Sequence, residues 1–419
     1  MPRSNETDHH LCEYAYQRDG SVTTPRAFSA GTASSGLKTS GGLDLALIVS
    51  NQDCNTAGVF TKNRLAAAPV IICRETLAQN PNRIRAVVAN AGVANACTGQ
   101  AGLDSARQMQ EMSAEALGCA PHQVLVLSTG VIGEPLDLDR VSPGIRQAAK
   151  NLSREQGVAA ATAIMTTDKY PKHASLGVEL SGGYVLLGGI AKGAGMIHPD
   201  MATMLAVITA DANLPVNRVN DLLAGAVATS FNCISVDGDT STNDSVILMA
   251  NGASGVEIRN EKDYEIFADA LKCISQELAQ MIVRDGEGAT KFVTLHVSGA
   301  RNMVDARQVG RTVAASPLVK TAIHGGDPNW GRIMAAIGRS GVSVDPERIS
   351  VSVSAPSYPE SFLVENGRGS AQSTASIYEI FRSSELSIEI ALGVGSARAT
   401  LWTCDFSEEY VEINAEYHT

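Results

Sequence analysis

The chain of 419 residues is too long for one ordinary hydrophobic core, so we expect two lobes or one large layered body. Its 44% hydrophobic and 18% charged residues are typical of a folded, soluble protein. The net charge of −11 and the lack of any basic block argue against a nucleic-acid partner, because phosphate binding requires clustered lysine and arginine.

The amino-terminal segment is polar. Residues 1–20 contain no apolar run, and they carry the acidic residues Glu6, Asp8 and Glu13. Because a secretory signal needs an apolar core, we expect residues 1–21 to form a flexible tail on a cytoplasmic protein. No uninterrupted apolar run in the chain approaches the ~18 residues that a membrane-spanning helix needs, so no membrane partner is expected.

Neither a metal nor a nucleotide is expected as a cofactor. The eight cysteines include no C-x-x-C pair, which argues against a zinc site and a disulfide framework. The segment from Asp237 begins like a calcium loop, but Thr242 stands where such a loop needs glycine. Residues 286–291 end like a phosphate loop, but their spacing does not fit that motif.

Short strands dominate the first third of the chain. One helix interrupts them over residues 105–117, where apolar residues recur at helical spacing and Gly118 is placed as a carboxy-terminal cap. The apolar runs of strand length, each bounded by turn-forming residues, cover 45–49, 58–61, 69–73, 85–89 and 124–127.

Helices and strands are mixed in the rest of the chain. Helices are expected over 141–152, 159–165, 217–231, 262–283 and 305–323, the last with a kink or a restart at Pro317. Strands are expected over 176–180, 184–187, 292–297, 350–354, 386–392 and 397–404, with hairpin turns at 182–183 and 393–395. This mixture predicts an α/β (α+β) fold class in which helices cover layered sheets.

The most informative stretch is 188–212, GGIAKGAGMIHPDMATMLAVITADA. Its glycine-rich loop can bring the backbone close to a ligand, and Pro199 prevents a helix across the next turn. Thr203 then follows Ala202 and precedes a long apolar run. From the residues alone, Thr203 is either a β-branched strand residue or a nucleophile.

Four other residues have both an ordinary and a catalytic interpretation. Thr129 and Gly130 follow a buried strand directly, where they either close a turn or stabilise a developing oxyanion. Thr166 ends a helix, where its side chain either caps the helix or contacts a ligand. Lys192, the permanent cation close in sequence to Thr203, is either a surface lysine or a substrate ligand.

Two motifs near the carboxy terminus contain further candidates. Glu287 leaves a long helix within RDGEGATK, where a carboxylate could recognise an ammonium group. The closing residues 410–419, YVEINAEYHT, are predicted to form an amphipathic strand that contains Asn414 and Thr419.

The chain resembles the ornithine acetyltransferases, also called glutamate N-acetyltransferases, over nearly all of residues 22–419. The resemblance implies an αββα-type layered sandwich of the self-processing ornithine acetyltransferase and β-aminopeptidase kind. The segment before Gly20 and residues 355–362 fit the family loosely. The matching motifs, in order, are VTTPRAFSAGTASSGLK, AGVFTKNRLAAAPV, NAGVANACTG, STGVIG, TTD, ATML, FNCISVDGDTSTNDS, RDGEGATK, GGDPNWGRIMAAIGRSG and YVEINAEYHT.

The resemblance also implies a self-processing mechanism. The bond between Ala202 and Thr203 would be cut, giving an α chain over 22–202 and a β chain over 203–419 that begins with the nucleophile Thr203. Thr129 and Gly130 would form the oxyanion hole. The substrate-binding residues implied are Thr166, Lys192, Thr203, Glu287, Asn414 and Thr419.

The implied reaction moves an acetyl group from N-acetylornithine to glutamate through an acetyl-Thr203 ester, without a cofactor, in an α2β2 assembly. Three alternatives stay open at this point. A bifunctional enzyme would also take acetyl from acetyl-CoA. An amidase or aminopeptidase-like hydrolase would admit water to the acyl-enzyme, and a binding protein would leave the Ala202–Thr203 bond intact.

Overall fold

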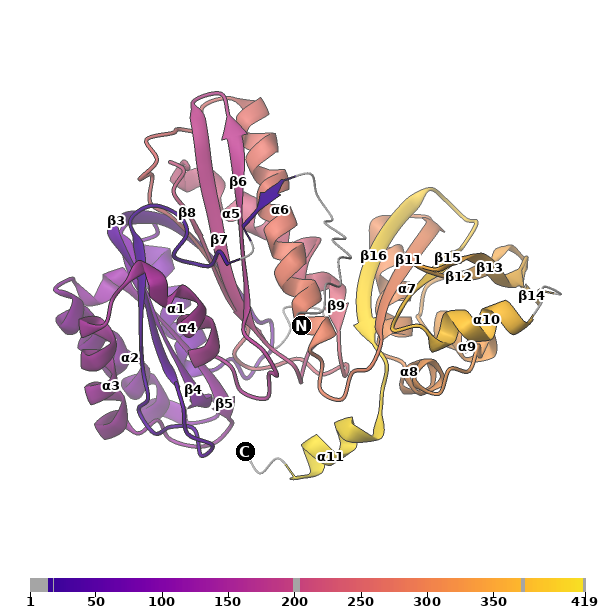
Figure 1. The fold of residues 1–419 in the computed structure, drawn as a ribbon, viewed down its shortest axis with the longest axis horizontal. Coiled ribbons are helices and arrows are strands. Elements are labelled where there is room, and N and C mark those ends of the chain that lie inside the picture. Colours follow the sequence, from indigo (N-terminus) through magenta and orange to yellow (C-terminus); the bar gives the residue numbers. More distant parts are fainter. Residues whose placement is uncertain (1–13, 18, 199–203, 371–373, 417–419) are drawn as a thin grey trace, which may run out of the picture.

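The computed structural model describes residues 14–17, 19–198, 204–370 and 374–416. Figure 1 shows two lobes side by side. The first lobe ends with the long helix α6 (Glu261–Arg284), and the second is formed by the chain that follows, up to β16 (Ala397–Cys404). The last helix, α11 (Glu408–Glu416), crosses back from the second lobe toward the first.

The first lobe is built on one sheet that bends at its longest strand. The strands, in spatial order, are β1 (Ala15–Tyr16), β6 (Lys172–Leu180), β7 (Gly183–Lys192), β8 (Leu205–Ala210), β10 (Ser245–Ala250), β3 (Leu45–Phe60), β4 (Ile84–Val93) and β5 (Val124–Val131), with β2 (Phe28–Ala33) also paired to β3. The first half of β3 pairs with β2 and β4, and its second half pairs with β10. The register shifts between Val49 and Cys54, so β3 belongs to two half-sheets.

The two half-sheets pack face to face, with helices on both outer surfaces. Along β8, Leu205 and Val207 join the core that contains β2 to β5, whereas Ala206 and Ile208 join the core beneath α5 and α6. The first-lobe helices are α1 (Ala68–Gln79), α2 (Gly99–Leu117), α3 (Leu138–Lys150), α4 (Gly157–Ala163), α5 (Val216–Ala228) and α6 (Glu261–Arg284). Helices α1 to α3 contact β2, β3 and β5. The layer order is therefore αββα, and the predicted sandwich is confirmed.

The second lobe is a sheet with its own core. Its strands, in spatial order, are β14 (Arg368–Gly369), β13 (Tyr358–Glu365), β12 (Ser350–Ala355), β15 (Glu385–Ala391), β11 (Phe292–Ala300), β16 (Ala397–Cys404) and β9 (Ile234–Ser235). Its helices are α7 (Met303–Ala314), α8 (Pro317–His324), α9 (Trp330–Gly338) and α10 (Thr374–Arg382). The short strand β9 follows the first-lobe helix α5 in the chain and pairs with β16, which joins the lobes.

Short 3₁₀ helices connect several of these elements: η1 (Pro121–Gln123), η2 (Arg154–Gln156), η3 (Phe231–Cys233) and η4 (Pro346–Arg348). The predicted helix over 105–117 lies within α2, and Gly118 adopts the left-handed cap conformation with φ of 66°. The predicted restart at Pro317 is also confirmed, because α7 ends at Ala314 and α8 begins at Pro317.

The predicted strand over 69–73 is wrong, because these residues form the start of α1. Pro69 lies in the first turn, where a helix does not use the N–H that proline lacks. A short buried apolar run fits either a strand or the inner side of a helix, so periodicity could not distinguish them. The two strands predicted over 45–49 and 58–61 are parts of the single strand β3.

The predicted strand over 410–419 is also wrong within the described residues, because 408–416 form α11. The alternation of apolar and polar residues that predicted a strand depended mainly on Val411 and Ile413. Acidic residues stabilise the first turn of a helix, and Glu408 and Glu409 occupy that turn in α11. The turn at 393–395 does not close a hairpin either. Strand β11 lies between β15 and β16, parallel to the first and antiparallel to the second.

The predicted tail over 1–21 is described only in part. Ala15 and Tyr16 pair with Leu176 and Gly177 of β6, so the end of this segment belongs to the sheet. No helix within the described residues is both long enough and apolar enough to cross a membrane.

Candidate active site

One cavity of about 320 Å³ collects residues from distant parts of the chain. Its lining residues are Ala94, Thr129, Gly130, Ile132, Thr166, Thr167, Lys192, Gly195, Met196, Ser241, Thr242, Asn243, Glu287 and Asn414. Six of them are predicted site residues: Thr129, Gly130, Thr166, Lys192, Glu287 and Asn414. The other predicted site residues, Ala202, Thr203 and Thr419, lie outside the described residues.

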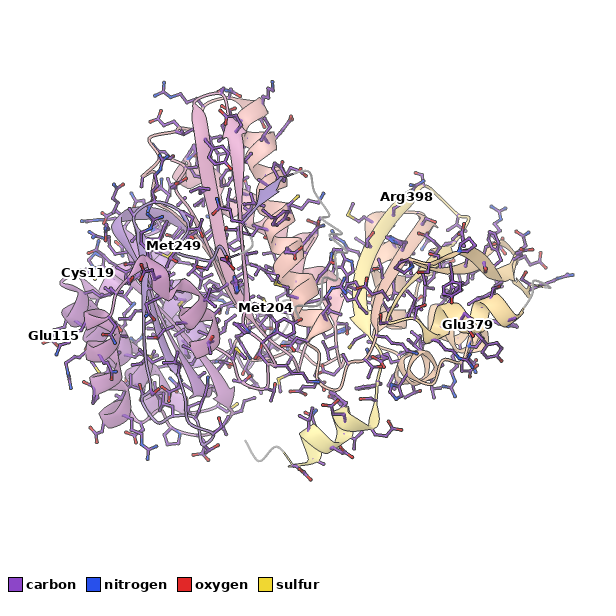
Figure 2. The ribbon with its side chains drawn as sticks, in the orientation of Figure 1. Glu115, Cys119, Met204, Met249, Glu379 and Arg398 are labelled. Carbon is purple, nitrogen blue, oxygen red and sulfur yellow. The ribbon has the colours of Figure 1, made fainter. Side chains whose placement is uncertain are left out.

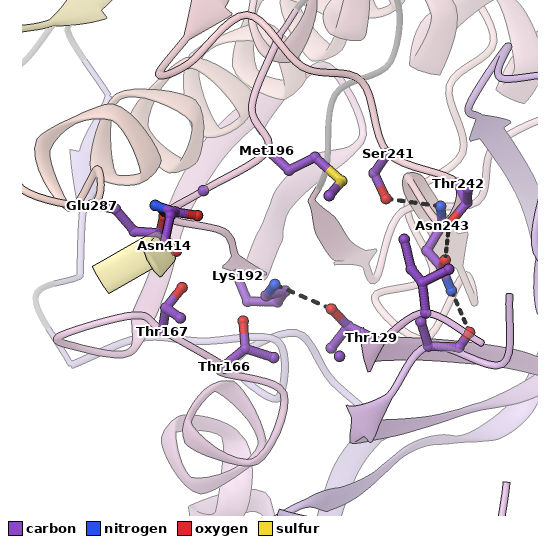
Figure 3. Close-up of a pocket in the computed structure, with 14 residues that line it drawn as sticks. Thr129, Thr166, Thr167, Lys192, Met196, Ser241, Thr242, Asn243, Glu287 and Asn414 are labelled. Carbon is purple, nitrogen blue, oxygen red and sulfur yellow. Dashed lines mark hydrogen bonds between the residues drawn. The ribbon is translucent and has the colours of Figure 1, made fainter. Parts of the chain in front are cut away.

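Lys192 lies in the middle of this cavity, at the end of β7 (Figure 3). Its side chain is buried, and its Nζ donates a hydrogen bond of 3.2 Å to Oγ1 of Thr129. Burial lowers the pKa of Lys192, although the nearby Asp168 carboxylate opposes that change. The buried carboxylates of Asp168 and Asp285 form their ion pairs with Lys172 instead. The site therefore presents a desolvated cation that is suited to bind a carboxylate.

Thr129 and Gly130 lie at the end of β5, where that strand meets β4. Gly130 has φ of 129°, and a Cβ on it would lie 2.2 Å from the backbone carbon of Gly92. Only glycine fits there without displacing β4. The turn therefore places the Thr129 hydroxyl beside Lys192 with little freedom to move.

We expect Thr129→Ala to lower kcat by ~100-fold, because it removes the hydroxyl that is predicted to stabilise an oxyanion. Thr129→Ser is the matched control, since it keeps the hydroxyl and should retain most of the rate. The steady-state rate of the acetyl transfer that the family resemblance implies is measured for both variants. A wild-type rate for Thr129→Ala would remove this role.

A buried ion cluster supports the loops around the cavity. Lys172 Nζ contacts Oδ1 of Asp168 at 2.6 Å and Oδ2 of Asp285 at 2.5 Å, and all three side chains are buried from solvent. Asp168 also accepts hydrogen bonds from the backbone N–H groups of Gly193 at 2.7 Å and Thr166 at 2.9 Å. One carboxylate thus fixes the loop that carries Thr166 relative to the end of β7.

Asp168 is ionised in this setting. Burial alone would raise its pKa, but Lys192 and Lys172 lower the pKa to about 2. The family resemblance implies a role only for the first threonine of TTD, and no role was predicted for Asp168, Lys172 or Asp285. The aspartate of that motif was the available signal, whereas nothing in the spacing connects it to Lys172 or Asp285.

Glu287 and Asn414 form the opposite side of the cavity (Figure 3). Asn414 Nδ2 donates to Oε2 of Glu287 at 2.8 Å, and the Glu287 backbone N–H donates to the carbonyl of Ala194 at 2.9 Å. A Cβ on Gly195 would lie 2.3 Å from a Glu287 carboxylate oxygen, so glycine lets the two segments approach. Helix α11 thereby delivers Asn414 to the carboxylate that faces the cavity.

A third side is formed by Ser241, Thr242 and Asn243, which the sequence analysis missed. Asn243 Nδ2 donates to the carbonyls of Ala94 at 2.7 Å and Ser128 at 2.9 Å, which ties this segment to the end of β4 and to the part of β5 just before Thr129. The family motif FNCISVDGDTSTNDS was the signal that could have identified these residues. Among the described residues, no group of three or more His, Cys, Asp or Glu side chains could hold a metal.

The loop that follows Lys192 is held by Asp237. Its Oδ1 accepts a hydrogen bond of 2.9 Å from the N–H of Ile197, and its Oδ2 accepts one from the N–H of Met196, a residue that lines the cavity. Burial raises the pKa of Asp237 to about 6, although the N–H groups of Asp239, Met196 and Ile197 favour the ionised form.

This pKa predicts a pH dependence of stability. An unfolded aspartate titrates near ~3.9, so between pH 4 and 6 the folded state holds a proton on Asp237 that the unfolded state has lost. The contribution of Asp237 to the free energy of unfolding should therefore fall as pH rises from 4 to 6. In Asp237→Asn this part of the slope should disappear, whereas the exposed neighbour variant Asp239→Asn should keep it. Thermal unfolding at several pH values measures the slopes, and equal slopes in wild type and Asp237→Asn would contradict the expectation.

Comparisons with known proteins agree on one family. The ArgJ family model matches residues 29–419. The arginine biosynthesis bifunctional protein ArgJ of Symbiobacterium thermophilum is 45% identical over 404 residues, which cover 96% of this chain and 99% of that protein. The mitochondrial arginine biosynthesis bifunctional protein ArgJ of Heterostelium pallidum is 42% identical over 411 residues, which cover 94% of each chain.

Solved structures of the same kind are also similar. A chain of arginine biosynthesis bifunctional protein ArgJ from Bacillus halodurans is 41% identical, covers 45% of this chain and 97% of its own length, and has a TM-score of 0.42. A chain of ornithine acetyltransferase from Mycobacterium tuberculosis, complexed with ornithine, is 36% identical, covers 44% of this chain and 98% of its own length, and has a TM-score of 0.41.

Proposed function

This chain belongs to the ArgJ family, and from that premise we propose that it transfers the acetyl group of N2-acetyl-L-ornithine to L-glutamate, giving L-ornithine and N-acetyl-L-glutamate. The observation that carries the proposal is the arrangement of charge in the cavity. The carboxylate of Glu287 lies on one side of the cavity, and the ammonium group of Lys192 lies in its middle. Ornithine and glutamate both carry a carboxylate and an amino group, so one such site suits donor and acceptor in turn.

The proposal begins with self-processing. The Thr203 hydroxyl attacks the Ala202 carbonyl, and hydrolysis of the resulting ester leaves chains 1–202 and 203–419. The freed α-amine of Thr203 has a reference pKa of ~7.7 to 8.0, so it can accept the hydroxyl proton near neutral pH. No histidine is needed as the base, because the nucleophile carries its own.

Acetyl transfer then follows in two steps. Thr203 takes the acetyl group from N-acetylornithine, while Thr129 and Gly130 stabilise the oxyanion of the tetrahedral intermediate. Lys192 binds the substrate carboxylate, and Thr166, Glu287, Asn414 and Thr419 complete the substrate contacts. Ornithine leaves, and the amino group of glutamate removes the acetyl group from Thr203. Donor and acceptor occupy the site in turn, so ping-pong kinetics are expected.

A second candidate activity is favoured by the relatives' names, which call those proteins bifunctional. In that form the enzyme also makes N-acetylglutamate from acetyl-CoA and glutamate, with acetyl-CoA as a substrate and no bound cofactor. An assay with acetyl-CoA and glutamate, without acetylornithine, tests this directly. Absence of N-acetylglutamate would exclude the second activity and leave the first.

The assay with N-acetylornithine and glutamate tests the main proposal. Formation of N-acetylglutamate that depends on both substrates supports it. Release of free acetate faster than transfer to glutamate would instead favour a hydrolase, the remaining enzymatic alternative.

The assembly and the compartment belong to the same proposal. We propose an α2β2 arrangement of the two processed chains, which the mass of the purified complex in solution tests. A cytoplasmic location is proposed as well. The names of the bacterial relatives give no compartment, and those of three eukaryotic relatives include mitochondrial, so cell fractionation is the test.

A further inference from the structure

One methionine lies on the wall of the cavity instead of in a hydrophobic core. Met204 and Met249 lie inside the first lobe and are almost entirely buried, as methionines ordinarily are (Figure 2). Met196 is 39% exposed, and it lines the cavity that contains Lys192 and Glu287. Its apolar surface is therefore available to a ligand in that cavity.

The backbone at Met196 is held in a conformation that bulky residues rarely adopt. Its φ of 57° lies in the left-handed region, which is costly for a residue with a long side chain. Asp237 fixes this conformation, because its Oδ2 accepts the Met196 N–H and its Oδ1 accepts the Ile197 N–H at 2.9 Å. The Val236 N–H also donates to the Ile197 carbonyl at 2.7 Å. Strain that is held in this way on a cavity wall points to a role in binding.

The Met196 side chain extends across the space between charged and polar groups. In Figure 3 it is directed toward Ser241, with Glu287 on one side of the cavity and Lys192 in its middle. Most of the lining is polar or charged, and Met196 and Ile132 are its large apolar side chains. A ligand held by the two charged groups therefore meets an apolar contact along its length.

We propose that Met196 is a specificity-determining residue, which contacts the methylene chain of the diamino-acid substrate. This inference rests on the proposed function, in which Lys192 binds a carboxylate and Glu287 binds an ammonium group. In N2-acetylornithine, methylene groups join the α-carbon to the free ammonium group. A chain that spans from Lys192 to Glu287 presents those methylenes to the flexible thioether side chain of Met196.

The first experiment compares Met196→Ala with Met303→Ala as the matched control. Alanine keeps the Cβ, so the left-handed backbone is no more strained in the variant, but the apolar contact is lost. Met303 begins α7 in the second lobe, where it is 53% exposed. The kcat/KM of acetyl transfer to glutamate is measured with N2-acetylornithine and with N2-acetyl-L-2,4-diaminobutyrate, which is one methylene shorter.

We expect the wild type and Met303→Ala to prefer N2-acetylornithine by ~10-fold or more, the scale of one methylene in an apolar pocket. Met196→Ala should lower kcat/KM for N2-acetylornithine by ~10-fold and reduce the preference to less than ~3-fold, because the apolar contact that recognises the longer chain is gone. Met196→Leu, which keeps a large apolar side chain, should retain most of the preference.

A second measurement does not depend on turnover. Calorimetric titration of L-ornithine and L-2,4-diaminobutyrate into the same proteins gives two dissociation constants, whose ratio should narrow in Met196→Ala. Thermal unfolding shows whether each variant is folded. If Met196→Ala does not fold, Met196→Gln takes its place, because glutamine keeps the length of the side chain and replaces the thioether with a polar amide.

Two outcomes would overturn the proposal. A wild-type preference in the folded Met196 variant would show that other residues discriminate between the two chain lengths. An equal loss of kcat/KM with both donors would assign Met196 to the support of its loop instead of to specificity. A wild type that transfers no acetyl group would refute the proposed function itself, and the dissociation constants would then decide the role of Met196.

Discussion

Thr203→Ala is expected to remain a single chain and to transfer no acetyl group. The substitution removes the one oxygen that the proposed mechanism uses twice, first to break the Ala202–Thr203 bond and then to carry the acetyl group. Without cleavage there is also no free α-amine to act as the base. Denaturing electrophoresis and the transfer assay measure the two losses on the same preparation.

The matched variant is Thr203→Ser, which keeps a hydroxyl and should retain part of both activities. Thermal unfolding of the Thr203→Ala precursor checks that it is folded. Acetyl transfer that survives in Thr203→Ala, or a chain that is still cut between residues 202 and 203, would contradict the mechanism.

Lys192→Met is expected to lower kcat/KM by roughly 100-fold or more, the scale of removing one partner from a buried, charge-assisted contact. Methionine keeps the length and much of the apolar stem of lysine but cannot bind the substrate carboxylate or donate to Thr129. The fold should tolerate the change, because Asp168 keeps its contact with Lys172. Lys150→Met, at an exposed position at the end of α3, is the control and should leave kcat/KM unchanged.

The pH dependence of kcat/KM provides a second test of this prediction. In the proposed mechanism Lys192 binds the substrate carboxylate, which requires it to be protonated, and burial lowers its pKa below the ordinary lysine value. In the wild type, kcat/KM should therefore fall as pH rises through that lowered pKa, and Lys192→Met should lack this alkaline decrease. A wild-type kcat/KM for Lys192→Met would exclude Lys192 from substrate binding.

Patterns that depend on neighbouring residues predicted the fold well. The helix that ends at Gly118 and the turn between β6 and β7 each follow from periodicity and a glycine at the right place. Such local patterns could not predict which strands far apart in the sequence pair with each other. The insertion of β11 between β15 and β16 depends on which strands meet in three dimensions, and the turn at 393–395 resembles a hairpin turn in sequence.

The candidate site was also predicted only in part. Resemblance to a family named Thr129, Lys192 and Glu287, and the structure brings all three to one cavity. The residues that support the loops around this cavity could not be predicted from the sequence. Lys172 lies 113 positions from Asp285, and only the folded chain shows that the two share a buried ion cluster.

The most direct test of the central claim is the intact mass of the purified wild-type protein, with sequencing of its amino termini. The account predicts two chains whose masses together equal the 43.9 kDa precursor plus one water, with Thr203 at the new amino terminus. A single species at 43.9 kDa would contradict it, because the proposed nucleophile and base would then never have formed.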